Sequence, residues 1–531
     1  MSGVGKGIAT SSLALILHSK GYRVNTVKVD PYLNVDAGTM NPTEHGEVFV
    51  LESGLETDQD MGNYERFLNR SLASEDYMTG GMVYQHVLAK ERNLEYKGRC
   101  VEAIPHVRDE IIRRYRAAGD TGRSDITVVE IGGTVGDFQN ALFIEAARVL
   151  KTEHPEDVVV ALVSYLPVPG TLGEMKTRPT QNAIHQLYSY GVAADLVIAR
   201  SSVPLDERRK AKIAAASGVP AEYIVSAPDV ESIYDVPLNF DNEAVGEALL
   251  KKLGLPNHPS HLKDWATFVQ KVKNAHRTVE IAIVGKYFDT GDFVLSDAYL
   301  SVIEAIKFSG AAVGVHPVIT WVNAKDFEKN PASVKDLGKY DGIIVPGGFG
   351  ETGIEGKIKA IEYARTHKIP YFGLCYGMQL MVVEYARHVA GLKDAHTVEI
   401  NAKTKDPVID VMLDQKELIQ SGRYGGTMRL GHYPAIIKKG TLAAIAYGEH
   451  EVSERHRHRY EVNPLYIEQL QKVGLVFSGT SPDGILMEIA ELPKSKHPFM
   501  LGTQFHPELQ ARPLSPHPLF TAFLKAAHKK P

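Results

Sequence analysis

The sequence predicts an α/β protein made of two doubly wound domains. Short apolar runs rich in β-branched residues alternate with helical patterns along the chain, which is typical of parallel α/β architecture. Near the middle, Leu255–His261 contains two prolines and breaks both periodicities, which indicates a boundary. The 531 residues, 44% of them hydrophobic, are enough for more than one buried core. We therefore expect domains at 1–255 and 278–531, with a linker at 256–277.

The expected elements follow in chain order. In the first half a helical pattern covers Lys6–Lys20, and the strand-like runs after it are Tyr22–Val29, Asp125–Ile131, Val158–Leu166 and Asp195–Ala199. In the second half the strand-like runs are Val279–Val284, Gly342–Val345 and Pro370–Leu374, with helical patterns at Asp297–Phe308 and Ile358–His367. The stretch Leu262–Arg277 is polar with few apolar residues, and predicts a partly helical linker.

The composition excludes several classes of protein. The 59 basic and 64 acidic residues give a formal net charge of −5, so neither a polycation that coats nucleic acid nor a long disordered acidic chain fits. The two cysteines, Cys100 and Cys375, cannot build a disulfide framework, which favours a reducing compartment, the cytoplasm. No run of about 18 apolar residues and no apolar signal segment is present, so we expect no membrane partner.

A glycine-rich segment at the N-terminus is suited to bind phosphate. Gly3-Val-Gly-Lys-Gly7 leads directly into the first expected helix, so that backbone N–H groups and the Lys6 ammonium can approach phosphate oxygens. Gly7 stands where a standard phosphate loop carries Ser or Thr, and a plain glycine-rich helix start is the alternative. No strand precedes the loop in this sequence, so we expect the sheet to lack its first strand and the loop to be less rigid.

Acidic and basic clusters further along could complete a nucleotide site. Asp58 and Asp60 lie in one polar segment, and Glu130 ends the apolar run Ile126–Ile131, where α/β sheets bind ligands. Mg²⁺ takes one or two carboxylates plus phosphate oxygens, so these acids could hold magnesium, unless they are only caps or solvated residues. The loop Lys176–Gln181 carries two cations with amide and hydroxyl groups, and it suits a second polyphosphate unless it is simply solvated.

The strongest motif lies in the second half. Tyr371-Phe-Gly-Leu-Cys-Tyr-Gly-Met-Gln379 runs from an apolar strand through Gly-x-Cys-x-Gly into a helical pattern. Small residues permit a strained turn that exposes a nucleophile at a helix N-terminus, where a thiolate is favoured. A lone cysteine in an apolar stretch is usually inert core, but the partners of Cys375 follow in the right order.

These partners lie near the C-terminus and after an earlier strand. His506 and Glu508 are two residues apart, so on an extended segment both side chains point the same way. Glu508 can then orient the imidazole that serves Cys375 as general base and acid. Gly347-Gly348 and the N–H of Tyr376 are candidate donors for an oxyanion hole.

These catalytic residues resemble those of class I glutamine amidotransferases, and longer motifs narrow the resemblance to the CTP synthase family. The motifs that carry it are Val29–Asn34, His45–Val50, Glu56–Phe67, Glu130–Asp137, Arg178–Gln181, Gly426–Gly431 and Glu454–Tyr460. They cover essentially the whole chain and are far more specific than the short phosphate loop. The resemblance implies a P-loop-like amidoligase domain at 1–255 and a class I glutaminase domain at 278–531.

The resemblance also implies a reaction and its partners. ATP would phosphorylate the 4-oxygen of UTP, and ammonia released from L-glutamine and channelled between the domains would displace phosphate to give CTP. Mg²⁺ is the implied cofactor, GTP the activator and CTP the feedback inhibitor. The implied assembly is a homotetramer, a dimer of dimers, in which the pyrimidine site is completed across subunits.

Individual residues are assigned by the same resemblance. The ATP site is implied at Gly3, Val4, Gly5, Lys6, Gly7, Ile8, Lys28, Asp60, Asp229 and Val230, with Asp60 and Glu130 as magnesium carboxylates. The UTP and CTP site is implied at Ser2, Asp137, Gln139, Lys176, Thr177, Arg178, Gln181 and Lys212. The glutamine pocket is implied at Gly348, Tyr376, Gly377, Met378, Gln379, Glu399 and Arg459. His45 matches the gate of the ammonia channel.

Four features depart from the family pattern. The strand and Gly-Gly turn that open the family are absent before the loop. Gln139 replaces a glutamate that contacts CTP, so we expect weakened or altered CTP inhibition. Thr352 replaces an arginine beside the GTP site, so we expect weaker GTP activation. Tyr376 replaces leucine after the nucleophile, a mild change because the backbone N–H acts there.

Two other functions stay open at this point. A different glutamine-dependent synthetase, such as a cobyrinic-acid amidase, has the same two modules, although Lys176–Gln181 and Asp58–Phe67 argue against it. A catalytically inert chain could instead serve as a regulatory or filament-forming partner. The intact set of Cys375, His506 and Glu508 argues against an inert glutaminase.

Overall fold

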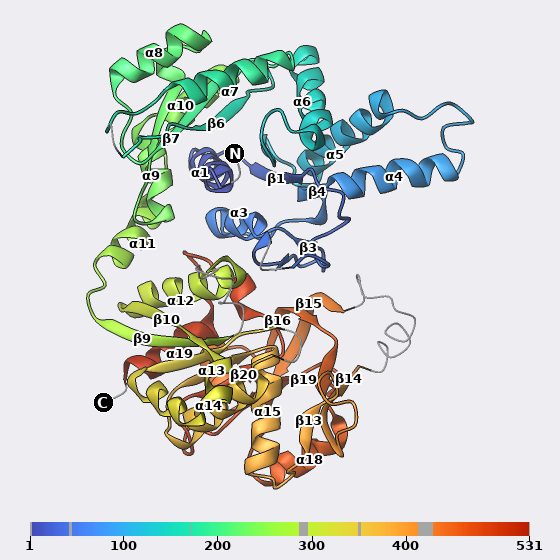
Figure 1. Ribbon diagram of the computed structural model, residues 1–531, viewed down its shortest axis with the longest axis vertical. Helices are drawn as coiled ribbons and strands as arrows, with labels where there is room; N and C mark the ends of the chain where they lie inside the picture. The colour runs from blue at the N-terminus through green and yellow to red at the C-terminus, as the bar shows by residue number, and fades with distance from the viewer. Residues whose placement is uncertain are drawn as a thin grey trace. The chain divides into compact units, whose positions relative to one another are not determined.

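The computed structural model describes residues 3–41, 45–170, 173–285, 296–348, 352–412 and 428–529 (Figure 1). By their contacts the residues divide into two compact units, Met1–Ala37 with Asn63–Val269 and Gly38–Gly62 with Gln270–Pro531. Both units are α/β, which confirms the predicted fold class. The segment Gly38–Gly62, which the sequence analysis included in the first domain, groups with the second unit.

In the described part of the chain, the strands of the first unit form two separate three-stranded parallel sheets. One has the order β4 (Tyr77–Thr79), β1 (Val24–Asp30), β5 (Ile126–Ile131), and the other β6 (Ala161–Tyr165), β7 (Leu196–Ser201), β8 (Ile224–Pro228). The central strands β1 and β7 are almost wholly buried, because each has a strand on both sides. The outer strands β5 and β6 are only partly buried.

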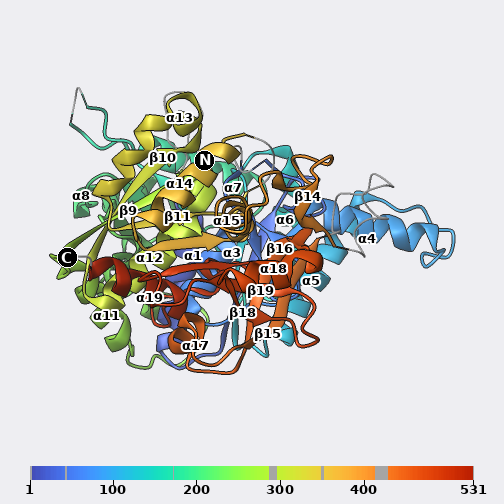
Figure 2. The same cartoon turned by 90° about the horizontal axis from the view of Figure 1, so that it is seen from below.

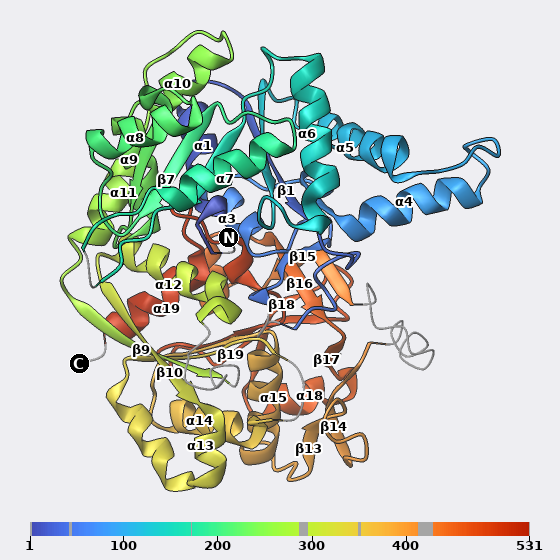
Figure 3. The same ribbon diagram turned by 45° about the horizontal axis from the view of Figure 1, so that its top comes forward.

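Helices surround these two sheets. They are α1 (Lys6–Ser19), α4 (Gly80–Arg92), α5 (Arg108–Thr121), α6 (Ala141–Glu153), α7 (Arg178–Ser189), α8 (Glu207–Ser217), α9 (Val236–Asn242) and α10 (Val245–Lys252). α1 follows the glycine-rich loop directly, and it is buried along most of its length. α5 and α6 pack on β1 through a core that includes Val27, Ile111 and Phe143. α4 and the loop after it project from the rest of this unit, and α7 lies across β6 (Figure 3).

Among the described residues, the second unit is built on a nine-stranded sheet. The strand order is β10 (His316–Asn323), β9 (Thr278–Gly285), β11 (Gly342–Val345), β12 (Tyr371–Leu374), β20 (Met500–Thr503), β19 (Met487–Glu491), β18 (Val476–Thr480), β15 (Arg429–Ile437), β16 (Glu451–His458). From β10 to β20 neighbouring strands are parallel, and from β20 to β16 they are antiparallel.

Helices cover both faces of the parallel half (Figure 2). α12 (Leu300–Val313) and α19 (Pro518–His528) pack together on one face, while α13 (Ala324–Lys329), α14 (Ile354–Thr366) and α15 (Tyr376–His388) lie on the other. The helices change face between β9 and β11, so the strand order reverses there, and the carboxyl ends of these strands are where α/β sheets bind ligands. Cys375 follows one such end, that of β12.

Smaller elements complete the two units. They are the sheet β13 (Ala395–Thr397), β14 (Asp406–Val411), β17 (Tyr460–Val462), the hairpin β2 (Phe49–Val50) and β3 (Glu56–Thr57), and the helices α17 (Leu442–Tyr447) and α18 (Pro464–Lys472). α3 (Asp60–Leu68) and α11 (Lys263–Lys273) cross the boundaries of the units, and α11 supplies the helix expected in the linker. Within the described ranges, every helix is too short or too polar to cross a bilayer.

Candidate functional site

Cys375 lies in a sharp turn between strand β12 and helix α15. Its φ of 49° and ψ of −98° are strained for a residue with a side chain, as at a nucleophile elbow. Two glycines make the turn possible: a Cβ at Gly377 would lie 2.1 Å from the Val345 carbonyl oxygen, and one at Gly373 would lie 2.7 Å from the backbone of Gly377. Because α15 begins directly after Cys375, its N-terminus favours the thiolate.

His506 and Glu508 form a close pair. Nδ1 of His506 lies 2.7 Å from Oε1 of Glu508, and since a carboxylate accepts, this nitrogen carries a proton. Nε2 is buried and makes no hydrogen bond with the described residues, so it is available to a reacting group. Burial lowers the pKa of His506, but attraction to Glu508 and to Cys375 outweighs it and raises the pKa to about 10. His506 is therefore an imidazolium at neutral pH, ready to give a proton.

Gly347 lies against both catalytic side chains. A Cβ at this position would come within 2.9 Å of Cε1 of His506 and 3.8 Å of Cβ of Cys375. A side chain at 347 would thus occupy space beside both His506 and Cys375. The predicted oxyanion donors approach this space from two elements, Gly347–Gly348 from the loop after β11 and Tyr376 from the start of α15.

Two residues that the sequence analysis did not single out contact the sulfur. Nε2 of Gln504 lies 3.6 Å from Sγ of Cys375, and the thiol can donate to the Arg457 carbonyl oxygen at 3.8 Å. Arg457 lies inside the motif Glu454–Tyr460, but a motif does not say which of its groups faces Cys375, and Gln504 lies in none of the motifs noted above. Spacing gives no signal for Gln504, because β20 ends at Thr503 and the chain bends at Gln504 and Phe505.

The tyrosine that replaces leucine after the nucleophile is accommodated by packing. Tyr376 is buried, and Nζ of Lys357 lies 5.5 Å from the centroid of its ring, within range of a cation–π interaction. The next pocket residue, Met378, is also buried and packs on Gly502, where a Cβ would lie 2.8 Å from the methionine Cβ.

The other predicted glutamine-pocket residues come from several elements. Gln379, on α15, is buried, and its Nε2 donates to the Tyr460 carbonyl oxygen at 2.9 Å. Glu399 follows β13, and its backbone N–H donates to Oγ1 of Thr397 at 3.3 Å. Arg459 lies between β16 and β17 and is partly buried.

The predicted gate residue, His45, lies in the segment Gly38–Gly62 and is exposed. This segment packs on β16: Arg455 donates to the Val50 carbonyl oxygen at 3.1 Å, and Nε of Arg457 donates to Oε1 of Glu56 at 2.8 Å. Arg457 therefore contacts the gate segment with its side chain and Cys375 with its carbonyl oxygen.

Two cations hold the glycine-rich loop of the first unit. Nζ of Lys6 donates to the Gly133 carbonyl oxygen at 2.8 Å, just beyond β5. Arg200, on β7, donates to the Val4 carbonyl oxygen at 3.3 Å and pairs with Asp229 at 2.8 Å. Arg200 thus joins two predicted ATP residues and was missed because no motif contains it. The remaining predicted residues here are Gly3 and Gly5, both with positive φ, Gly7 and Ile8 in α1, and Val230 beside Asp229.

The predicted magnesium carboxylates lie on different elements. Glu130, on β5, is buried and pairs with Lys28 at 3.0 Å, while the Tyr64 hydroxyl donates to its second oxygen at 2.5 Å. Asp60 begins α3, and its backbone N–H donates to Oδ1 of Asp58 at 2.9 Å. Across the described residues, no three His, Cys, Asp or Glu side chains are arranged to hold a metal alone. Mg²⁺ at a nucleotide site takes one or two carboxylates and completes its shell with phosphate oxygens, so each of these carboxylates has the donor chemistry that Mg²⁺ prefers.

The predicted pyrimidine-nucleotide residues lie on three segments of the first unit. Nε2 of Gln181 lies 3.4 Å from Oγ1 of Thr177 and 3.5 Å from the Lys212 carbonyl oxygen, which links α7 to α8. Lys176, in the loop before α7, forms an ion pair with Glu174 at 2.6 Å. The further members are Arg178 at the start of α7, and Asp137 and the exposed Gln139 after β5. Ser2 lies outside the described residues, and Thr352 is exposed.

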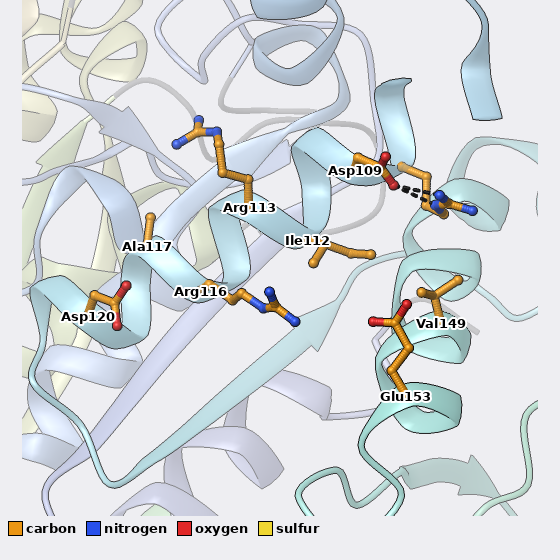
Figure 4. A pocket seen from close by; sticks show the side chains of 9 residues that line it. Asp109, Ile112, Arg113, Arg116, Ala117, Asp120, Val149 and Glu153 are labelled. Carbon is orange, nitrogen blue, oxygen red and sulfur yellow. Dashed lines mark hydrogen bonds and ion pairs between the residues drawn. The ribbon is translucent and has the colours of Figure 1, made fainter. Parts of the chain in front are cut away.

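An open cavity of about 550 Å³ lies between α5 and α6 (Figure 4). No predicted site residue lines it. Two of its arginines are paired, Arg108 with Asp109 at 2.6 Å and Arg113 with Glu110 at 2.7 Å. The lining residues are Arg108, Asp109, Ile112, Arg113, Arg116, Ala117, Asp120, Val149 and Glu153.

Comparison with known proteins gives consistent matches along the chain. The family model "CTP synthase N-terminus" matches residues 1–255, and "Glutamine amidotransferase class-I" matches residues 294–526. The chain is 48% identical over 532 residues to the CTP synthase of Thermococcus gammatolerans, covering 100% of this chain and 97% of that protein. It is 49% identical over 529 residues to that of Pyrococcus furiosus, covering 99% and 96%. A solved glutaminase domain of Trypanosoma brucei CTPS is similar at 37% identity and a TM-score of 0.44, covering 48% of this chain and 95% of that one.

Proposed function

The chain belongs to the CTP synthase family, whose members aminate UTP to CTP with glutamine as nitrogen donor, and we propose that Cys375, His506 and Glu508 perform its glutaminase half-reaction. One observation supports this most strongly: three separate elements converge on the sulfur. They are the elbow itself, the His506–Glu508 pair at 2.7 Å, and Gly347, whose absent side chain leaves room beside both catalytic groups. A nucleophile, a proton carrier and oxyanion donors are the parts that acyl transfer needs.

The glutaminase steps follow from this arrangement. The thiolate of Cys375 attacks the carboxamide carbon of glutamine, and the carbonyl electron pair moves onto oxygen, where backbone N–H groups of Gly347 and Tyr376 stabilise it. As the intermediate collapses, His506 gives its proton to the leaving nitrogen, and ammonia departs from the thioester. His506 then takes a proton from water, whose oxygen attacks the thioester and releases glutamate. Glu508 keeps the proton on Nδ1 throughout.

Substrate recognition in this half is proposed for residues with matching charge. Arg459 would bind the α-carboxylate of glutamine and Glu399 its α-ammonium group, since charged hydrogen bonds are the strong ones. Gly348, Gly377, Met378 and Gln379 would shape the pocket around the carboxamide. His45 would act as the gate through which ammonia leaves.

The amidoligase half is proposed to activate UTP. ATP transfers its γ-phosphoryl group to O4 of UTP, which converts a poor leaving group into phosphate, and ammonia adds at C4 and expels that phosphate. Gly3–Ile8 would cradle the ATP phosphates, Lys6 and Lys28 would balance their charge, and Asp229–Val230 would hold the adenine. Mg²⁺, held by Asp60 and Glu130, would neutralise charge on the transferring phosphate when bound.

Regulation is proposed at the pyrimidine site. Ser2, Asp137, Gln139, Lys176, Thr177, Arg178, Gln181 and Lys212 would bind UTP and, in competition, CTP. Gln139 carries no charge, so CTP inhibits weakly, and Gln139→Glu strengthens inhibition; an inhibition curve unchanged by that substitution contradicts the assignment. With Thr352 in place of arginine, GTP activates weakly, and strong activation at low GTP speaks against this.

The proposed assembly is a homotetramer in the cytoplasm. Large apolar side chains are exposed on the first unit, including Leu33 at 73%, Leu88 at 59% and Phe138 at 100%, and such exposure is typical of an interface. Both cysteines are free, as suits a reducing compartment. Sedimentation velocity with and without UTP and ATP measures the assembly state.

One assay tests the proposed function. Conversion of UTP to CTP is followed by absorbance with ATP and Mg²⁺, with either glutamine or free ammonia as nitrogen donor. The wild-type chain uses both donors, whereas Cys375→Ala loses glutamine-dependent synthesis and keeps ammonia-dependent synthesis, because ammonia bypasses the thiol. Cys100→Ser, which removes the exposed cysteine, is the matched control and leaves both activities intact.

The other outcomes separate the alternatives. If glutamine is hydrolysed but neither donor yields CTP, the amidoligase half is inactive and a regulatory or filament-forming role gains support. If Cys375→Ala retains glutamine hydrolysis, the nucleophile is misassigned.

A further inference from the structure

Gln504 occupies an unusual position beside the nucleophile. It directly follows β20, is fully buried, and points its side-chain nitrogen at Sγ of Cys375 from 3.6 Å. Its backbone is fixed as well, since its N–H donates to the Glu488 carbonyl oxygen at 2.8 Å. A buried side-chain amide that lies against a sulfur atom donates a hydrogen bond to the sulfur if the amide nitrogen, and not the amide oxygen, faces the sulfur.

The orientation of this amide is determined by a chain of contacts that starts at a backbone carbonyl. The Tyr460 carbonyl oxygen can only accept, so the group of Gln379 that lies 2.9 Å away must be its side-chain nitrogen. The same nitrogen lies 3.3 Å from the end of Gln504, which must therefore present its oxygen. The nitrogen of Gln504 is left facing Cys375. Both N–H bonds of Gln379 are used in this relay, one to each acceptor.

We infer that Gln504 is a catalytic hydrogen-bond donor to the thiolate of Cys375, and that Gln379 is a positioning residue that holds the Gln504 amide in this orientation. The inference rests on the proposed role of Cys375 as nucleophile. The Gln504 amide and the Arg457 carbonyl oxygen act on the sulfur in opposite senses. The Arg457 carbonyl oxygen, at 3.8 Å, can interact favourably only with the protonated thiol, whereas the Gln504 N–H interacts most strongly with the thiolate.

The donor affects both halves of the glutaminase cycle. In the resting enzyme the Gln504 N–H stabilises the thiolate of Cys375 and so increases its population. A more stable thiolate is a slightly weaker nucleophile, but the gain in population is larger than this loss. In thioester hydrolysis the sulfur leaves as thiolate, so an N–H aimed at it stabilises the departing charge. The ammonia-dependent reaction uses no thiolate and gains nothing from Gln504.

The test uses the full chain in a Cys100→Ser background, so that Cys375 is the remaining thiol. Gln504→Met removes the donor at similar length, and Gln379→Met removes the residue that orients it. Gln510→Met is the matched control, because Gln510 is an amide on the same segment that bonds the Ser453 carbonyl oxygen at 3.1 Å and has no part in the relay. Alkylation of Cys375 by iodoacetamide, a neutral reagent, is followed by mass spectrometry from pH 4 to pH 10.

The expected result is a shift in the pH of half-maximal alkylation. In Gln504→Met this pH rises by roughly one unit, a tenfold smaller thiolate fraction below the midpoint. Gln379→Met shifts it the same way but less, and the double variant shifts it no further than Gln504→Met, since Gln379 acts through Gln504. Gln510→Met leaves it unchanged. Glutamine-dependent kcat falls about tenfold in Gln504→Met with KM little changed, while ammonia-dependent synthesis stays at the wild-type rate.

The outcomes distinguish this inference from the proposed function. If Cys375→Ala still hydrolyses glutamine, the proposed function fails first and Gln504 loses its role with it. If wild-type Cys375 is the nucleophile but Gln504→Met, folded by its melting temperature, keeps the wild-type alkylation profile, the inference alone is overturned. Should Gln504→Met not fold, Gln379→Met decides, because an unshifted profile there shows that the relay does not act on the sulfur.

Discussion

Glu508 determines the charge of the residue beside it. Its carboxylate lies 2.7 Å from Nδ1 of His506, and with Cys375 it reverses the effect of burial, so the pKa of His506 rises to about 10. The residue proposed to give a proton to leaving ammonia is therefore already protonated at pH 7. The Glu508 carboxylate therefore affects both the orientation of the His506 ring and the ability of His506 to act as an acid.

Glu508→Gln removes that charge while keeping the hydrogen-bond geometry. The pKa of His506 should fall, because burial is then opposed by less attraction, and glutamine hydrolysis at pH 7.5 should drop about a hundredfold. The pH–rate profile and NMR titration of the imidazole measure both effects. Ammonia-dependent CTP synthesis serves as the internal control and is unchanged; an unaltered imidazole titration contradicts the explanation.

How far single residues could be predicted depended on their neighbours in sequence. His506 and Glu508 do pair as expected, but Glu508 lies in a short 3₁₀ helix, Pro507–Gln510, and not on the extended segment that the spacing argument assumed. The strand–Cys375–helix turn followed from its glycines. Gln504 and Arg200 were not predictable, because their roles come from contacts with Cys375 and Val4 that lie 129 and 196 positions away. No local pattern encodes such contacts.

At the scale of elements, β16 separates two sets of charged groups. On one face Arg455 and Arg457 contact the segment Gly38–Gly62, which contains the proposed gate residue His45. On the other face His456 lies 2.9 Å from His458 and 3.6 Å from Glu488. Successive side chains of a strand point to opposite faces, so Arg455 and Arg457 have different partners from His456 and His458 although the four residues are consecutive in sequence. Through Arg457, β16 contacts both Cys375 and the segment Gly38–Gly62.

Breaking the buried pair between Glu56 and Arg457 should loosen the packing of Gly38–Gly62 on β16. Glu56 is 2% exposed at its pair with Arg457, so Glu56→Gln leaves a charge with reduced compensation and should destabilise the second unit by about 3 kcal/mol. The matched control is Glu52→Gln, where the acid is 41% exposed and 3.8 Å from Arg455, and the expected cost is below about 1 kcal/mol. Calorimetric melting compares the two; equal shifts contradict a special role for Glu56.

The same strand explains which elements were predictable. Apolar parallel strands such as β9, β11 and β12 were found because their residues are buried on both faces. The polar run Glu454–Arg459 gave no apolar period, yet much of it is buried, because its charges are paired by residues far along the chain. Likewise, no periodicity could reveal that Gly38–Gly62 packs with the second unit.

For the molecule as a whole, buried histidines set the pH range of stability. Burial, helped by Arg429, lowers the pKa of His456 and His458 well below 6.5, so the unfolded chain binds protons there that the folded chain does not. Stability therefore falls as the pH drops below about 6.5. His506, with its pKa raised to about 10, has the opposite effect: its contribution is full below 6.5 and is lost as the pH rises toward 10.

The melting temperature of the second unit should thus be highest near neutral pH and fall on both sides. Scanning calorimetry from pH 5 to pH 10 measures the curve, and Glu508→Gln should flatten its alkaline side by removing most of the shift at His506. A melting temperature that is constant across this range would rule out the linkage.

The two separate sheets of the first unit have a consequence for how its backbone exchanges with solvent. β1 is bonded to strands on both sides, whereas β5 is bonded only to β1 among the described strands. Amides of β5 that face away from β1 have no ladder bond to break before they exchange. Deuterium uptake should therefore be faster in β5 than in β1. If another chain segment or subunit pairs with the free edge of β5, uptake should be slowed at alternate residues of β5.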